Sequence, residues 1–213
     1  MSDIFREIDE EVRRDQLLAT WKKYRYLIIA VVAAVILGVG GYQAWQSYEQ
    51  GQRAAAAESY ALAEAQLGEG EIQDALRRFA ELADPDGGGY ALLAAFEVAR
   101  LAAENQNSEL ALETWGEIAD SGAPLTYRDA AVLAAAGYRI DRGEYQEAET
   151  MLAALTEPGR PYRALAVELS AIAALGRDDA QTARERLEGL LADIEAPAGL
   201  RERAGDLVRS LSE

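Results

Sequence analysis

The chain of 213 residues has no cysteine and no histidine, and its formal net charge at pH 7 is −16. The missing cysteine excludes disulfides, thiol nucleophiles and thiolate metal sites, and the missing histidine removes the commonest metal ligand and neutral-pH acid–base group. Such an acidic chain repels nucleic acid and anionic lipid headgroups, so its composition favours a well-solvated domain or one that meets basic partners.

Residues 1–25 predict an amphipathic leader helix. Ser2 and Asp3 suit a helix start, and apolar residues follow at helical spacing. Acidic residues lie early in this segment and basic residues late, as the helix dipole favours. The segment could dock a partner, lie on a membrane or act only as a leader, and the sequence leaves these roles open. Its apolar positions are Ile4, Phe5, Ile8 and Val12.

Residues 26–48 form one uncharged, mostly apolar run. About 20 such residues, at a rise of about 1.5 Å each, span the roughly 30 Å hydrocarbon core of a bilayer. No second run follows, so we expect a single membrane-spanning helix. Ala30, Ala34 and Gly38 share one face of that helix and would let a partner helix pack closely. Aromatic residues mark both ends of the run, with Trp21, Tyr24 and Tyr26 on one side and Tyr42, Trp45 and Tyr48 on the other.

Charges on the two sides of the run predict its orientation. Basic residues concentrate before it, among them Lys22, Lys23 and Arg25, whereas Arg53 is the only base just after it. Because such bases stay in the cytoplasm, we expect a cytoplasmic N-terminus and a translocated domain of residues 49–213. The alternative is a cleaved signal peptide. A long, acid-containing segment before the run, and the length of the run itself, favour an uncleaved anchor.

From Arg53 onward the sequence repeats at intervals of 35 to 37 residues, which predicts stacked helix pairs. In each unit a helix rich in small residues precedes a polar turn and a second helix. A marker alanine on the second helix is followed four residues later by a bulky apolar residue, and a proline closes the unit. The markers are Ala75, Ala111, Ala148 and Ala183, the bulky residues are Phe79, Trp115, Leu152 and Leu187, and the prolines are Pro85, Pro124, Pro158 and Pro197.

The expected fold is therefore all-α, with the membrane helix followed by a solenoid. No helix pair of this kind buries its own apolar face, so the units must stack. We expect about four helix pairs and a closing helix whose charged side chains suit the cap that a solenoid needs. The expected first helices of the four pairs are 54–67, 90–103, 128–140 and 163–175, and the expected cap is 198–211.

The marker alanine, the bulky residue and the closing proline resemble the A-x3-F and terminal proline pattern of the tetratricopeptide repeat. The match is degenerate, since only Phe79 and Trp115 are aromatic at the F position and the W-x2-L-G-x2-Y signature of the first helix is not kept. The resemblance implies that the first helices line an inner face suited to an extended or helical peptide segment. The alternative for each residue on that face is packing between repeats. The residues that the repeat register places there are Tyr60, Glu64, Leu67, Leu93, Phe96, Arg100, Leu133, Ile140, Leu165, Glu168 and Ile172.

The whole layout resembles a bacterial family. A leader that includes residues 5–16 and 21–24, one spanning helix and degenerate repeats are similar to the YfgM-like ancillary subunits of the SecYEG translocon, whose repeat domain is similar to that of the cell-division coordinator. The resemblance implies an inner-membrane protein with a periplasmic repeat domain. It also implies association with the SecYEG translocon and a membrane-anchored periplasmic chaperone, to assist the hand-over of secreted proteins. An envelope scaffold that coordinates cell division or peptidoglycan synthesis is the alternative.

We expect no enzyme, no cofactor and no metal site. The segment 84–89 resembles the start of a calcium loop, but Ala95 occupies the position where that loop requires glutamate. A glycan hydrolase using paired carboxylates would need two acids converging in a cleft, and a helical solenoid with scattered surface acids disfavours that arrangement.

Overall fold

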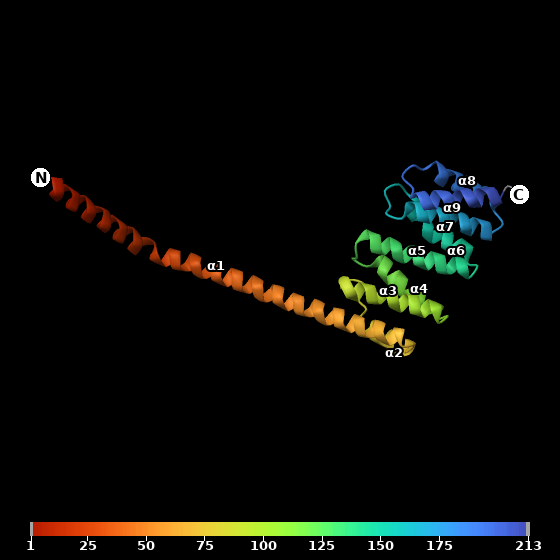
Figure 1. The fold of residues 1–213 in the computed structure, drawn as a ribbon, viewed down its shortest axis with the longest axis horizontal. Helices are drawn as coiled ribbons and strands as arrows, with labels where there is room; N and C mark the ends of the chain where they lie inside the picture. The colour runs from red at the N-terminus through yellow and green to blue at the C-terminus, as the bar shows by residue number, and fades with distance from the viewer. Residues whose placement is uncertain (1, 212–213) are drawn as a thin grey trace. The chain divides into compact units, whose positions relative to one another are not determined.

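The computed structural model describes a helical chain without strands in the backbone of residues 2–211 (Figure 1). It divides into two compact units, residues 1–54 and residues 55–213. The predicted solenoid is confirmed in the second unit. The side chains described are those of residues 21, 25, 26, 29–31 and 34–211, so those of Ile4, Phe5, Ile8 and Val12 lie outside the described residues.

Helix α1 (Ser2–Gly68) runs without a break from the leader through the apolar run and into the repeats. The repeat spacing predicted a new helix start near residue 54, but no proline interrupts this stretch and its glycines are accommodated in the helix. In the described part of the chain, one helix segment is apolar and long enough to cross a bilayer; it lies within Ile29–Gly68 and has a mean hydropathy of 1.5. Its large apolar side chains, such as Ile36 and Leu37, are exposed.

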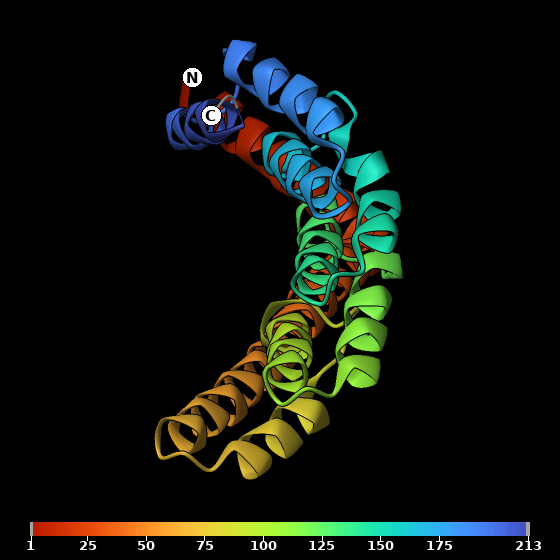
Figure 2. The same ribbon diagram turned by 90° about the vertical axis from the view of Figure 1, so that its right-hand side faces the viewer.

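The helices of residues 55–213 form two layers (Figures 1 and 2). Figure 2 shows the end of α1 with α3, α5, α7 and α9 on the inner side of a curve, and α2, α4, α6 and α8 on its outer side. Each of α3, α5 and α7 packs against the outer helices that precede and follow it in the chain, and α9 packs against α8. The bounds are α2 Ile72–Leu82, α3 Gly89–Glu104, α4 Ser108–Asp120, α5 Leu125–Asp141, α6 Tyr145–Leu152 continued by the 3-10 turn Ala153–Thr156, α7 Arg163–Gly176, α8 Ala180–Ala192 and α9 Ala198–Ser210.

The four marker alanines are fully buried where the paired helices meet. A methyl group at this position lets two helices approach closely, and the bulky residue one turn later fills the space beside the contact. Phe79, Leu152 and Leu187 are also fully buried, and Trp115 nearly so. Each of these residues belongs to a separate hydrophobic cluster, so the core is a chain of four clusters, one for each repeat.

The turns within the four repeats share one backbone feature. The residue five positions before each marker alanine has a positive φ, which glycine adopts readily and other residues do not. Gly70 and Gly143 occupy it in two repeats, but Gln106 (φ 61°) and Asp178 (φ 62°) occupy it in the other two. In those two repeats the next residue, Asn107 or Asp179, caps the following helix by accepting a hydrogen bond from a backbone N–H. The hydrogen bonds from Thr182 lower the pKa of the Asp179 carboxyl below its ordinary value of 3.8.

The first prediction concerns core packing on α8. Leu187 is 0% exposed and Leu191 is 39% exposed on the same helix. Leu187→Ala should lower the free energy of unfolding by about 2–5 kcal/mol because it leaves a cavity in the hydrophobic cluster of the fourth repeat. Leu191→Ala is the matched control and should cost less than about 1 kcal/mol. Urea unfolding of the full-length protein in detergent, followed by circular dichroism, measures both. Equal effects would show that α8 is not packed as described.

The second prediction concerns the strained turn before α8. Asp178→Gly should raise the free energy of unfolding by about 0.5–1 kcal/mol, because glycine accepts the positive φ without steric cost. Glu185→Gly, at an exposed position inside α8, should instead lower it by about 0.5–1 kcal/mol. The same unfolding measurement applies. A stability loss in Asp178→Gly would contradict the left-handed geometry of this turn.

Candidate partner-binding face

Three inner helices each present one row of side chains that are exposed or only half-buried. Because α3 packs against α2 and α4, its unburied row lies on the inner side of the curve. That row is Leu93, Glu97 and Arg100, at positions i, i+4 and i+7, while the intervening Ala94, Ala95, Val98 and Ala99 are buried. The equivalent rows are Ala130, Ala134 and Gly137 on α5, and Leu165, Leu169 and Ile172 on α7. We call these three rows the inner face.

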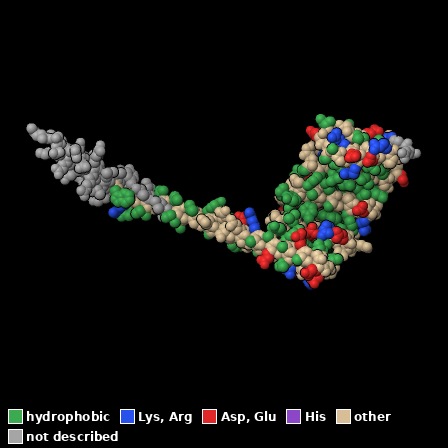
Figure 3. Space-filling view, viewed as in Figure 1, with side chains coloured by type: hydrophobic (Ala, Val, Ile, Leu, Met, Phe, Trp, Pro, Cys, Tyr) green, Lys and Arg blue, Asp and Glu red, His purple; other side chains and the backbone are tan. Residues whose placement is uncertain are grey.

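The chemistry of the inner face changes from helix to helix. The α3 row is largely charged, the α5 row consists of small residues and the α7 row is aliphatic. Figure 3 shows hydrophobic side chains gathered over the middle of this side of the domain, with charged side chains at both ends. An unburied apolar area bordered by charge is typical of a protein-binding surface.

The charges on α3 are paired with one another. The Arg100 guanidinium donates hydrogen bonds to Glu97, with Nε 3.0 Å from Oε2, and to Glu104, with Nη1 2.6 Å from Oε1. The hydrogen bond to Glu97 is the main cause that raises the pKa of Arg100 above its ordinary value. Two carboxylates around one guanidinium leave this edge of the inner face with a net negative charge.

The residues that the repeat register placed on this face differ in how deeply they are buried. Leu133 and Glu168 are buried, so their side chains belong to the packing between helices. Five others are half-buried and pack onto the hydrophobic clusters: Tyr60, Leu67, Phe96, Ile140 and Leu165. Glu64 and Leu93 are exposed, and Arg100 and Ile172 are half-buried. That these unburied residues contact a partner remains a prediction.

Two members of the predicted set have clear structural partners. The ring of Tyr60 lies edge-on to Phe79 at 5.2 Å and tilted against Tyr90 at 5.4 Å, which joins the end of α1 to α2 and α3. The Glu168 carboxylate accepts two hydrogen bonds from Arg203, at 2.8 and 2.7 Å, and so links α7 to α9. A buried carboxylate needs such a partner, because an unpaired buried charge is strongly destabilising.

Two exposed tyrosines and the α5 row were not predicted from the sequence. Tyr90 and Tyr127 are each 42% exposed and lie three residues before Leu93 and Ala130, at the N-terminal ends of α3 and α5. Both tyrosines lie at the same distance in sequence before a marker alanine, and this shared spacing could have identified them. The α5 row gave no signal in the sequence because alanine and glycine have no polar, charged or large apolar side chain.

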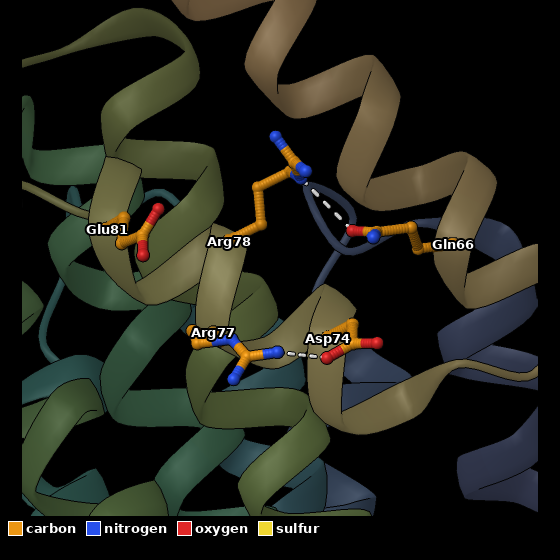
Figure 4. A pocket seen from close by; sticks show the side chains of 5 residues that line it. All are labelled: Gln66, Asp74, Arg77, Arg78 and Glu81. Carbon is orange, nitrogen blue, oxygen red and sulfur yellow. Dashed lines mark hydrogen bonds and ion pairs between the residues drawn. The ribbon is translucent and has the colours of Figure 1, made fainter.

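One pocket lies between the end of α1 and α2, and four of its five lining side chains are paired with one another. It is about 270 Å³ in volume (Figure 4). Arg78 donates a hydrogen bond to Gln66 across 3.0 Å, and Arg77 is paired with Asp74. Among the described residues, no group of three or more carboxylates is arranged to hold a metal ion.

Comparison with known proteins identifies the repeats. A sequence search against curated proteins gave no significant match. A crystal structure of nearly identical TPR-like repeats, from a putative kinesin light chain of Podospora anserina, is similar with a TM-score of 0.50 at 18% sequence identity. The match covers 75% of this chain and 94% of that chain and, at this identity, shows the fold alone. The sequence pattern of the tetratricopeptide repeat-like domain family matches residues 19–198, and the chain therefore belongs to that family.

Proposed function

We propose that this protein is a membrane-anchored, non-catalytic interaction module that acts beside the SecYEG translocon of a bacterial inner membrane. Tetratricopeptide repeat-like domains serve generally as scaffolds that bind peptides or proteins. The observation that carries the proposal is one continuous helix that joins an exposed apolar stretch to a repeat domain with an unburied inner face. Exposed apolar side chains over a membrane-length helix are stable in lipid and unfavourable in water.

The proposed partners are the translocon and a membrane-anchored periplasmic chaperone. The order of leader, single span and degenerate repeats supports this assignment, as does the placement of the acidic excess. Residues 1–48 hold six basic and six acidic residues, so the net charge of −16 belongs to the repeat domain. An anchor confines that domain to the membrane plane beside the channel, which raises its effective concentration for emerging chains or for chaperones.

The third prediction concerns topology. The chain has no cysteine, so a single introduced cysteine reports its own location. Ser2→Cys should resist a membrane-impermeant maleimide on intact spheroplasts, whereas Glu188→Cys, exposed on α8, should be labelled. Both should be labelled after the membrane is permeabilised, which is the control. Labelling of Ser2→Cys alone before permeabilisation would reverse the proposed orientation.

The fourth prediction concerns the partners. Affinity purification of the full-length protein from membranes in mild detergent should recover subunits of the SecYEG channel and a membrane-anchored chaperone, identified by mass spectrometry. If the small-residue face packs against a channel helix, the double substitution Ala34→Leu and Gly38→Leu should reduce recovery of the channel by about tenfold.

The matched control for the fourth prediction lies on another face of the same helix. Gly40→Leu and Ala44→Leu also replace one glycine and one alanine four residues apart, and should leave recovery unchanged. Equal recovery of the channel with both double variants would show that the small-residue face does not contribute to the interaction. Recovery of division or peptidoglycan proteins without the channel would contradict the translocon assignment and favour the envelope scaffold.

A further inference from the structure

We infer that the groove between α6 and α8, on the outer side of the repeat domain, binds the ammonium group of a lysine side chain that a partner protein supplies. The inference rests on the proposed role of the domain as an interaction module. It adds a second surface, away from the inner face, and names the kind of side chain that this surface takes.

The α6–α8 groove has a volume of about 460 Å³ and is built by both layers of the domain. The helix α6 and the 3-10 turn after it form one side, α8 contributes Arg186 from the other, and α7 contributes Val167 and Ser170. Successive residues of an α-helix are about 100° apart, so these two residues lie opposite the inner-face row of α7. The groove therefore opens away from the inner face.

The outer layer departs from its regular pattern at this groove. The helix α6 has 8 residues, whereas α4 and α8 have 13 each, and α6 continues as the 3-10 turn Ala153–Thr156. A 3-10 turn winds more tightly than an α-helix and so redirects the side chains at its end. Thr156 and Glu157, at the end of this turn and directly after it, both line the groove.

The first two repeats contain an equivalent groove, between α2 and α4, that is more apolar. It has a volume of about 400 Å³, and Leu76 and Val98 line it. Counted from the marker alanines, Glu149 takes the position of Leu76 in the α6–α8 groove, and Ser170 takes the position of Val98. Polar groups at positions that packing alone would fill with leucine and valine are unfavourable for stability, which points to a function.

Three side chains of the α6–α8 groove are able to accept hydrogen bonds from a ligand. Ser170 is 3% exposed, and its hydroxyl forms no hydrogen bond with another described residue. The Thr156 hydroxyl donates to the Ala153 carbonyl oxygen at 2.7 Å, so its oxygen is left to accept. Glu157 is exposed and forms no ion pair within the described part of the chain. Two hydroxyls and a carboxylate suit an ammonium group, which has three N–H donors and no acceptor.

The other charged side chains of the groove are paired with one another. The Arg186 guanidinium donates from Nη1 to the Ser170 carbonyl oxygen at 2.8 Å and from Nη2 to the Glu149 carboxylate. Glu149 is also paired with Arg177, whose Nη2 lies 2.6 Å from its Oε2. The charge that remains unpaired at the groove is therefore the carboxylate of Glu157, and it attracts a cation.

Lysine suits the groove better than arginine, and the repeat domain has none of its own. A guanidinium is planar and favours two parallel hydrogen bonds to one carboxylate, whereas a compact ammonium can reach separate oxygens. Val167 and Ala153 offer apolar surface to the aliphatic stem of lysine. The lysines of the chain are Lys22 and Lys23, on the other side of the membrane in the proposed topology. The lysine must therefore come from another protein, which the acidic excess of the domain would attract.

The fifth prediction uses Nα-acetyl-lysine N-methylamide as a probe of the groove. Methyl NMR of the full-length protein, labelled at valine and held in nanodiscs of zwitterionic lipid, measures its binding. The probe should shift the Val167 signal in a saturable way and leave the signal of Val98, in the equivalent groove, unchanged. The norleucine counterpart, which lacks the ammonium group, and the arginine counterpart should each bind at least about fivefold more weakly.

Variants of the groove complete the test. Glu157→Gln and Ser170→Ala should each weaken binding of the lysine probe by at least about fivefold, because each removes an acceptor. Glu147→Gln is the matched control, since Glu147 is an exposed carboxylate on α6 that does not line the groove. It should bind the probe as the natural protein does. Circular dichroism and thermal unfolding confirm that the variants fold.

Four outcomes would overturn the inference. Equal binding of the norleucine compound would reduce the contact to its apolar part, and equal binding of the arginine compound would remove the preference for lysine. An equal loss in Glu147→Gln would mean attraction by the overall charge. Tighter binding of cadaverine, a free diamine, would identify the occupant as a small amine. The probe requires no partner, and recovery of the channel is measured separately, so failure of the groove and failure of the translocon assignment are distinguishable.

Discussion

The close approach of paired helices at four buried alanines is the contact on which the repeat domain depends. A methyl group there sets the separation between inner and outer helices, and the bulky residue one turn later occupies the space that this separation leaves. The helices α3, α5 and α7 pack against the outer helices before and after them in the chain, and α7 also contacts α5 and α9. The side that faces away from the outer helices is left exposed or half-buried, so the rule that builds the core also creates the inner face.

The turn before the second helix of each repeat has the same backbone geometry in all four repeats, but two different kinds of residues form it. Where Gly70 and Gly143 supply the positive φ, the next residue is a glutamate that makes no side-chain cap. Where Gln106 and Asp178 must adopt it, the next residue caps the following helix. A left-handed non-glycine residue costs about 1–2 kcal/mol, and a helix cap contributes about 1 kcal/mol in return. The repeats thus share one turn geometry although its residues differ.

The repeat register was enough to predict the helix pairs, the core alanines and the capping helix, because each follows from local spacing. It did not predict that α1 would continue unbroken through residue 54, because the start of each helix was inferred from the repeat. The stretch contains no proline that would end a helix there. It also placed Leu133 and Glu168 on the inner face, by analogy with Tyr60 and Phe96. That register position lies at the border between the face and the core. Burial of Glu168 depends on Arg203, 35 residues away, and such a partner is invisible to local periodicity.

The N-terminal end of α5, which carries one row of the inner face, is held by an ion pair. Asp129, buried at the start of α5, accepts a hydrogen bond from Arg160 in the segment before α7, with 2.5 Å between the atoms. From there on, ion pairs join successive repeats through Glu149 and Glu168, whereas the described ion pairs before residue 129 stay within single helices. These ion pairs order α5 and α7 in the unbound protein. Groups that are already ordered lose little conformational freedom when a partner binds, so more of the contact energy appears as affinity. This order favours the proposed role of the inner face in binding.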